Sequence, residues 1–105
     1  MKKIISFNKI GGPEVLEFKD IEESKELKAD EVLYEVKAFA LNRSDWLFSA
    51  GLHYTIPKLP SRIGSEASGI VKAIGSSVTK FKIGDKVSSI PFFTTEYLVH
   101  GEIAI

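Results

Sequence analysis

Apolar and polar residues alternate over short stretches of this chain, and glycine or proline separates most of these stretches. The alternation has a period of two, which is typical of β-strands with one buried face. It is clearest in residues 31–41, where one face carries Val32, Tyr34, Val36 and Ala38 and the other carries Leu33, Glu35 and Lys37. Further strands are predicted at residues 4–7, 15–18, 67–74, 86–90 and 95–100.

The segments between these strands predict turns and loops. Gly11-Gly12-Pro13 predicts a turn that joins the first two strands into a hairpin. Residues 21–30 are rich in Glu, Lys and Ser and have too few apolar positions to pack one helical face, so they predict a connecting loop. Pro57 and Pro60 predict a loop over residues 52–63. Short strands at this spacing predict an antiparallel barrel or sandwich.

One segment predicts a short helix. Ser44 and Asp45 precede the apolar run Trp46-Leu47-Phe48, and Gly51 follows it. We interpret Asp45 as the N-cap and Gly51 as the C′ residue of a helix of about two turns. The alternative for Asp45 is a role as an acid or in orienting its neighbours.

Composition excludes several classes of function. The 105 residues suit one domain, and 14 basic residues balance 14 acidic ones, so no uniform positive surface is expected for nucleic acid or an anionic membrane. The N-terminus lacks the apolar run of a signal peptide, and no stretch approaches the roughly 20 apolar residues of a membrane span, so we expect a cytoplasmic protein. The absence of cysteine excludes disulfides, thiolate nucleophiles and cysteine zinc sites, and leaves two histidines, His53 and His100.

Several motifs follow one another in an order that resembles a known family. They are the Gly-Gly-Pro-Glu turn at residues 11–14, Leu41-Asn42 followed by Asp45, Ser49-Ala50-Gly51, Leu59-Pro60 before Gly64, and Gly84-Asp85-Lys86-Val87. Each is weak alone, but their order resembles the N-terminal GroES-like domain of medium-chain dehydrogenases/reductases, in the quinone oxidoreductase (zeta-crystallin-like) branch. The resemblance implies that residues 1–105 form a mainly β, partly open barrel with one or two short helices.

The resemblance also bears on zinc. Zinc-dependent relatives carry a cysteine where Asn42 stands and a histidine where Ser65 stands. An amide and a hydroxyl are weak, neutral ligands, and a catalytic zinc needs about three good protein donors, so we predict no metal. In the zinc relatives a glutamate at the position of Glu66 lies next to the metal's ligands without being a ligand itself. Without a metal we expect Glu66 to be structural, paired with Arg43 or Arg62.

Asn42 and Tyr54 are the catalytic candidates that the resemblance implies. It implies reduction of a quinone or an enone-like carbonyl compound by NADPH, with a hydrogen-bond donor for the oxygen that gains charge. Asn42 would bind the nicotinamide carboxamide or a substrate oxygen, and the alternative is that it only ends a strand in a left-handed or capping conformation. Tyr54 would donate to the substrate, although His53 intervenes after the Gly-Leu pair of the relatives. The alternatives are a site role for His53 or an ordinary loop position.

The substrate pocket is predicted to include Trp46, Ser65 and Phe92, with Phe48 and Phe93 as further aromatic candidates. Packing in the core is the alternative for the aromatic residues.

The cofactor's phosphates are not expected to bind to these residues. Gly64, Gly69 and Gly75 do not form the G-x-G-x-x-G of a dinucleotide fold, so we interpret them as β-turn and packing residues. The resemblance implies that a Rossmann domain follows and binds NADP, and that the full protein with both domains is active. It also implies a homodimer formed largely through the Rossmann domain. We therefore interpret the chain as an N-terminal fragment, with a free-standing domain as the alternative, and in either case we expect it to be inactive alone. The alternatives are an enoyl or alkenal reductase of the same superfamily and a non-catalytic GroES-like binding module.

Overall fold

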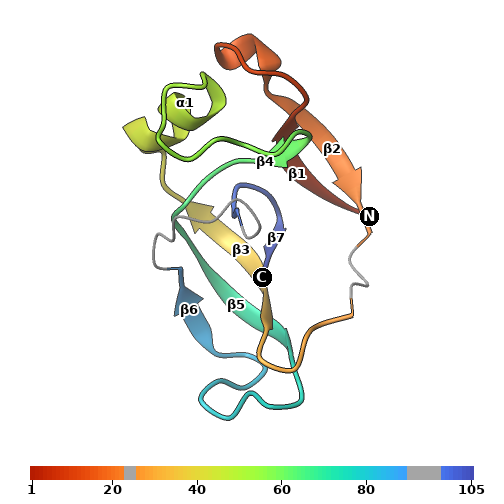
Figure 1. Cartoon of the computed structure of the whole chain (residues 1–105). Coiled ribbons are helices and arrows are strands. Elements are labelled where there is room, and N and C mark those ends of the chain that lie inside the picture. The colour runs from red at the N-terminus through yellow and green to blue at the C-terminus, as the bar shows by residue number, and fades with distance from the viewer. Residues whose placement is uncertain (23–25, 90–97) are drawn as a thin grey trace.

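The computed structural model describes residues 1–22, 26–89 and 98–105, and it is mainly β with one short α-helix. The predicted fold class is therefore confirmed. In chain order the elements are β1 (Lys2–Phe7), a 3-10 helix (Pro13–Val15), β2 (Glu17–Ile21), β3 (Val32–Phe39), α1 (Arg43–Ser49), β4 (Ser61–Arg62), β5 (Ala67–Ile74), β6 (Lys86–Ser88) and β7 (Ile103–Ala104) (Figure 1).

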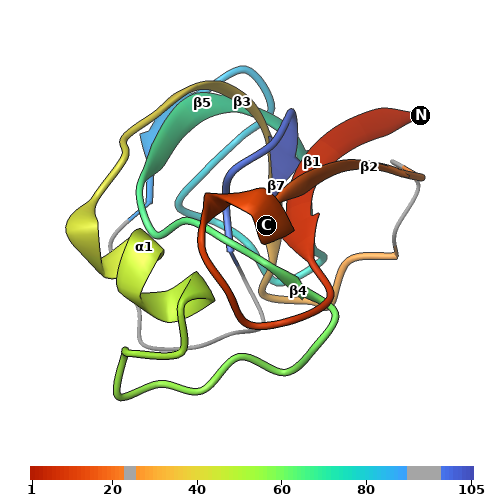
Figure 2. The ribbon, with the colours of Figure 1, turned by 90° about the horizontal axis from the view of Figure 1, so that it is seen from above.

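The strands form two antiparallel sheets with the orders β2-β1-β4 and β6-β5-β3-β7. The segment that leads into β7 joins them. The backbone N–H of Glu102 donates to Lys3 in one sheet at 2.8 Å, and its carbonyl accepts from Val36 in the other at 2.8 Å. Seen from above, the strands curve around a common interior with α1 beside them (Figure 2). This arrangement agrees with the expected partly open barrel.

The opening hairpin is confirmed, but its second strand begins later than predicted. β1 pairs with β2 from Lys2 opposite Ile21 to Ser6 opposite Glu17. Val15 belongs instead to the 3-10 helix, which proline can start because its fixed φ suits a first helical position. The strand predicted at residues 15–18 therefore starts at Glu17.

The two long central strands, β3 and β5, are confirmed and pair with each other. Their register shifts between Leu33 and Tyr34 and again between Val36 and Ala38. Both Leu33 and Tyr34 are buried, so the strict alternation predicted for residues 31–41 fails at the first shift. A β-bulge changes which face a side chain occupies, which explains the departure.

Two short strands were not predicted. β4 lies inside the predicted loop at residues 52–63 and pairs with the end of β1, and β7 pairs with β3. Two residues are too few to show an alternating pattern. β6 is confirmed as far as Ser88. Of the strand predicted at residues 95–100, residues 95–97 lie outside the described part, and residues 98–100 run beside Ile63 and Gly64 without forming a strand.

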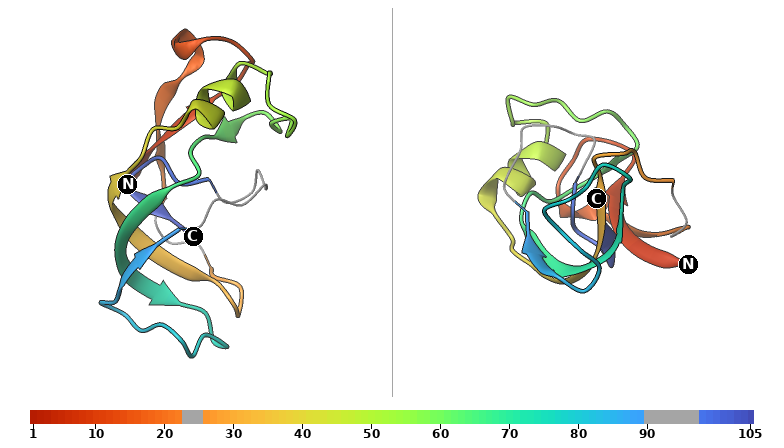
Figure 3. Two further views of the ribbon diagram at one scale, coloured as in Figure 1. Left: turned by 90° about the vertical axis from the view of Figure 1, so that its left-hand side faces the viewer. Right: turned by 90° about the horizontal axis from the view of Figure 1, so that it is seen from below.

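Many of the buried apolar residues in the described part of the chain belong to one of two clusters. One contains Phe7, Val15, Phe48, Ile63 and Leu98. In it the rings of Phe7 and Phe48 meet edge to face at 5.8 Å, which fixes α1 against the sheet that contains β1. Phe48 therefore belongs to the core, as its alternative interpretation held. The other cluster lies between β3, β5 and β7 and contains Tyr34, Ala67, Val99 and Ala104. Figure 3 shows how the two sheets and α1 surround this interior.

No helix in the described part of the chain is long and apolar enough to cross a membrane.

Candidate functional site

The start of α1 is held by a capping interaction between Asn42 and Asp45. Asn42 is the N-cap, with extended backbone angles, and its carbonyl accepts from the N–H of Asp45 at 3.0 Å. The Asp45 carboxylate reaches back and accepts from the N–H of Asn42 at 3.0 Å. Asp45 as N-cap was therefore wrong, because it occupies the third helical position. The Asn-x-x-Asp spacing is the sequence signal for this arrangement.

The side chain of Asn42 contacts the segment that enters β5. Its Nδ2 donates to Oε2 of Glu66 at 3.0 Å, and the Glu66 carbonyl accepts from the N–H of Ala40 at 3.0 Å. Glu66 thus pairs with Asn42 rather than with Arg43 or Arg62. Because a carboxylate only accepts hydrogen bonds, the amide group of Asn42 must turn its NH₂ nitrogen toward Glu66.

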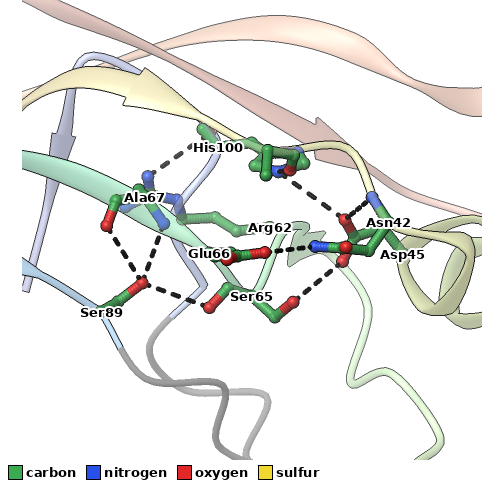
Figure 4. Close-up of polar contacts among 9 residues, drawn as sticks. Asn42, Asp45, Arg62, Ser65, Glu66, Ala67, Ser89 and His100 are labelled. Atoms are coloured by element: carbon green, nitrogen blue, oxygen red, sulfur yellow. Dashed lines mark hydrogen bonds and ion pairs between the residues drawn. The ribbon is translucent and has the colours of Figure 1, made fainter.

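Asp45, which is buried, lies between the half-buried Ser65 and the buried His100 (Figure 4). Its Oδ1 lies 3.5 Å from the Ser65 hydroxyl, and its Oδ2 lies 3.8 Å from Nε2 of His100. That Nε2 lies 2.9 Å from the carbonyl oxygen of Ala40. Since a carbonyl only accepts, the imidazole carries a proton on Nε2 and donates it. His100 was not among the predicted site residues, and no motif around it indicates the role.

His100 is held in place by Phe39 and Gly64. Its ring stacks on Phe39 with centroids 4.1 Å apart, and a Cβ atom at residue 64 would collide with ring atoms of His100. Gly64 also has a φ of +101°, a conformation that favours glycine. The first glycine of the predicted turn pattern therefore provides room for a buried imidazole.

Comparison with known proteins identifies the fold that carries this site. The family model described as "Alcohol dehydrogenase GroES-like domain" matches residues 28–103. The chain belongs to this family. A quinone oxidoreductase of Pseudomonas aeruginosa is 47% identical over 88 residues, covering 84% of this chain and 26% of that protein. The GroES-like domain described here therefore belongs to the quinone oxidoreductase branch.

Solved structures agree with this assignment. The structure of the quinone oxidoreductase of Coxiella burnetii matches with a TM-score of 0.87 and 31% identity, covering 98% of this chain and 33% of that one. The Escherichia coli quinone oxidoreductase complexed with NADPH matches with a TM-score of 0.79 and 35% identity, covering 96% and 29%. This GroES-like domain thus spans between a quarter and a third of the length of these relatives.

The structure separates the predicted site residues of this GroES-like domain into groups. Asn42 and Ser65 are brought together around Asp45. Tyr54 is 72% exposed and stacks on His53, with centroids 4.3 Å apart.

Of the two aromatic residues predicted for the pocket, the structure describes Trp46. Trp46 lies on α1, 45% exposed, with the Arg43 guanidinium 5.9 Å from its ring centroid. Phe92 lies outside the described residues.

The polar side chains at this site do not fit zinc. Asn42 presents its amide nitrogen to Glu66, and the Ser65 hydroxyl faces Asp45. Both act as hydrogen-bond donors, whereas a zinc ligand must offer a lone pair, usually from sulfur or imidazole nitrogen. Within the described ranges, no three His, Asp or Glu side chains gather where they could hold a metal ion.

Arg62 and Tyr34 place polar groups in the interior beneath the site. Nη2 of Arg62 donates to the carbonyl of Ile103 at 2.8 Å. Burial lowers the pKa of Arg62 to about 10, which the nearby Tyr34 partly opposes. Burial raises the pKa of Tyr34, against the opposing influence of Ser89 and Arg62.

Proposed function

We propose that this chain is the substrate-side domain of an NADPH-dependent, zinc-independent oxidoreductase that reduces quinones or enone-like carbonyl compounds. The observation that carries the proposal is the Asn42 amide, which is exposed at the start of α1 and oriented by Glu66. The quinone oxidoreductase relatives support the reaction class, and the NADPH complex of the Escherichia coli relative supports the cofactor.

The Asn42 amide fits the nicotinamide end of the cofactor. A nicotinamide carboxamide has both a donor and an acceptor, and it needs a partner that offers both. Oε2 of Glu66 accepts a hydrogen bond from Nδ2 of Asn42, so the amide nitrogen is turned toward Glu66 and the side-chain oxygen toward the backbone N–H of Asp45 in the capping box. That oxygen has two lone pairs and would accept from the carboxamide NH₂. Asn42 would in this way hold the reactive ring against the substrate.

Other residues would act on the substrate. When bound, NADPH supplies a hydride to the quinone or enone, and the substrate oxygen that gains negative charge needs a proton or a hydrogen-bond donor. We assign the donor to the Tyr54 hydroxyl, which is exposed on a ring stacked against His53. Trp46 and Ser65 would border the substrate, and Phe92 stays a prediction for the same pocket.

The absence of zinc from this mechanism follows from the donor chemistry. Asn42 and Ser65 stand where zinc-dependent relatives carry their ligands, and both face carboxylates as hydrogen-bond donors. Charge on the substrate oxygen would therefore be stabilised by hydrogen bonds instead of a metal.

We further propose that the cofactor's phosphates bind to a Rossmann domain in the rest of the protein. Residues 1–105 contain no G-x-G-x-x-G motif, and the relatives are three to four times as long as the part they share with this chain. The GroES-like domain alone would then hold the substrate and the nicotinamide without turning over.

The experiment is an assay of the protein encoded by the complete reading frame that contains this chain. NADPH oxidation is followed with 1,4-benzoquinone and, separately, with an α,β-unsaturated aldehyde. Quinone-dependent oxidation supports the proposal, and turnover of the aldehyde alone would reassign the protein to the alkenal reductases. If NADPH is oxidised neither in the presence of the quinone nor in the presence of the aldehyde, the proposed reaction class is contradicted.

A further inference from the structure

We infer that His100 is a positioning residue for Asn42. The His100 imidazole holds the chain on both sides of Asn42. The inference rests on the proposed function only for what Asn42 binds. The hold itself is a property of the described structure, and it can be measured without any cofactor.

Nε2 of His100 lies close to two groups that hold the chain around Asn42, the carbonyl of Ala40 and the carboxylate of Asp45. Nε2 donates to the carbonyl of Ala40, which lies at the end of β3, at 2.9 Å. The same atom lies 3.8 Å from Oδ2 of Asp45, the atom that accepts from the N–H of Asn42. His100 therefore contacts the chain just before Asn42 and the first turn of the helix just after it.

The imidazole is itself held firmly enough to act in this way. It is 3% exposed and lies between the ring of Phe39 and Gly64. The backbone of His100 donates to Ile63 at 2.9 Å and accepts from Ile5 at 3.2 Å. Restraint from β1, the end of β3 and the segment before β5 leaves Nε2 little freedom to move.

Packing alone does not account for a histidine at this position. An apolar side chain of similar size would fill the volume against Phe39 and Gly64. It would leave the Ala40 carbonyl without the imidazole donor, and the buried Asp45 carboxylate would keep the Asn42 N–H and the Ser65 hydroxyl but lose the nearby imidazole N–H. The donor on Nε2, rather than the volume, is therefore the property that matters.

The test compares His100→Leu and His100→Gln in the complete protein. Leucine keeps apolar bulk without a donor, whereas the glutamine amide carries a donor close to the position of Nε2. We expect His100→Leu to raise the KM for NADPH about tenfold, the effect of about one hydrogen bond, while His100→Gln stays within about threefold of wild type. The KM for the quinone should change less than the KM for NADPH in both variants.

A double variant separates positioning from general stability. Asn42→Ser keeps a good helix cap but removes the amide. If His100 acts through Asn42, His100→Leu should add little to the KM for NADPH in the Asn42→Ser background. An equal further rise in that background would overturn the inference.

Hydrogen exchange tests the hold independently of turnover. The amides of residues 41–45 should exchange faster in His100→Leu than in wild type, and at the wild-type rate in His100→Gln. If the wild-type protein reduces no quinone but this difference is seen, only the proposed function fails. If the exchange rates are equal, the positioning role fails. Should His100→Leu not fold, His100→Asn replaces it, since its shorter amide does not reach the position of Nε2.

Discussion

The imidazole ring of His100 occupies the space that a Cβ atom at Gly64 would need. Gly64 also has a φ of +101°. Glycine is therefore required there for two separate reasons: the backbone conformation and the room for a buried ring.

Gly64→Ala should destabilise the fold more than Gly84→Ala, and the two variants are a matched pair. Gly84 has a similar φ of +95°, but a Cβ atom there meets nothing within 4 Å. Gly84→Ala should cost about 1–2 kcal/mol from backbone strain alone. Gly64→Ala adds a clash with His100 and should cost about 1–3 kcal/mol more. Urea unfolding measures both, and equal losses would contradict the described position of His100.

Tyr34→Phe should reduce the loss of stability at alkaline pH. Burial raises the pKa of Tyr34 above its usual value of 10, so the unfolded chain loses this proton first as the pH rises. The contribution of the protonated Tyr34 to the unfolding free energy is complete below about pH 10. It is lost as the pH rises from there through the higher pKa that Tyr34 has in the folded state. Wild type should therefore lose stability more steeply above pH 10 than Tyr34→Phe.

The same variant should cost little at neutral pH. The Tyr34 hydroxyl is buried and forms no hydrogen bond of good geometry among the described residues, although Ser89 lies near enough to lower its pKa, so its removal should change the unfolding free energy by less than about 1 kcal/mol. Tyr54→Phe, which removes an exposed hydroxyl, is the control. Urea unfolding at a series of pH values gives both results. Parallel pH profiles for wild type and Tyr34→Phe would show that Tyr34 is not the group responsible.

Glu66→Ala should weaken NADPH binding because it frees the Asn42 amide to rotate. Glu66 Oε2 accepts from Nδ2 of Asn42 at 3.0 Å. Loss of this one hydrogen bond should raise the KM for NADPH about tenfold. Glu35→Ala removes a different glutamate, in β3, which pairs with Lys37 at 2.7 Å, and should leave the KM unchanged. Steady-state kinetics of the complete protein distinguishes the two, and similar values for both variants would argue against a role for Glu66.

Removal of metal ions should not affect activity. Asn42 and Ser65 present hydrogen-bond donors to Glu66 and Asp45. The complete protein should keep its rate of NADPH oxidation with a quinone after dialysis against a strong chelator. The metal content is measured in the same samples. A rate that falls in proportion to bound zinc would contradict the donor argument.

The sequence pattern predicts the long elements of this fold better than the site. Residues 67–74 alternate over a whole strand, and the prediction matches β5, whereas β4 and β7 are too short to show a period. The site role of Asn42 stays a prediction, and the prediction of Asp45 as N-cap is wrong because the Asn-x-x-Asp spacing of the capping box was not recognised. The role of His100 depends on contacts with Ala40 and Asp45, which lie far away in the chain and are brought close only by folding.

The most direct test of the account is the steady-state kinetics of Asn42→Ser in the complete protein, with NADPH and a small quinone. The control is Asn8→Ser, because Asn8 also donates from Nδ2 to a glutamate, Glu17, at 2.8 Å. The account predicts that Asn42→Ser lowers kcat/KM for NADPH at least about tenfold, while Asn8→Ser equals wild type. An Asn42→Ser protein with wild-type kcat/KM would contradict the proposal that Asn42 holds the nicotinamide.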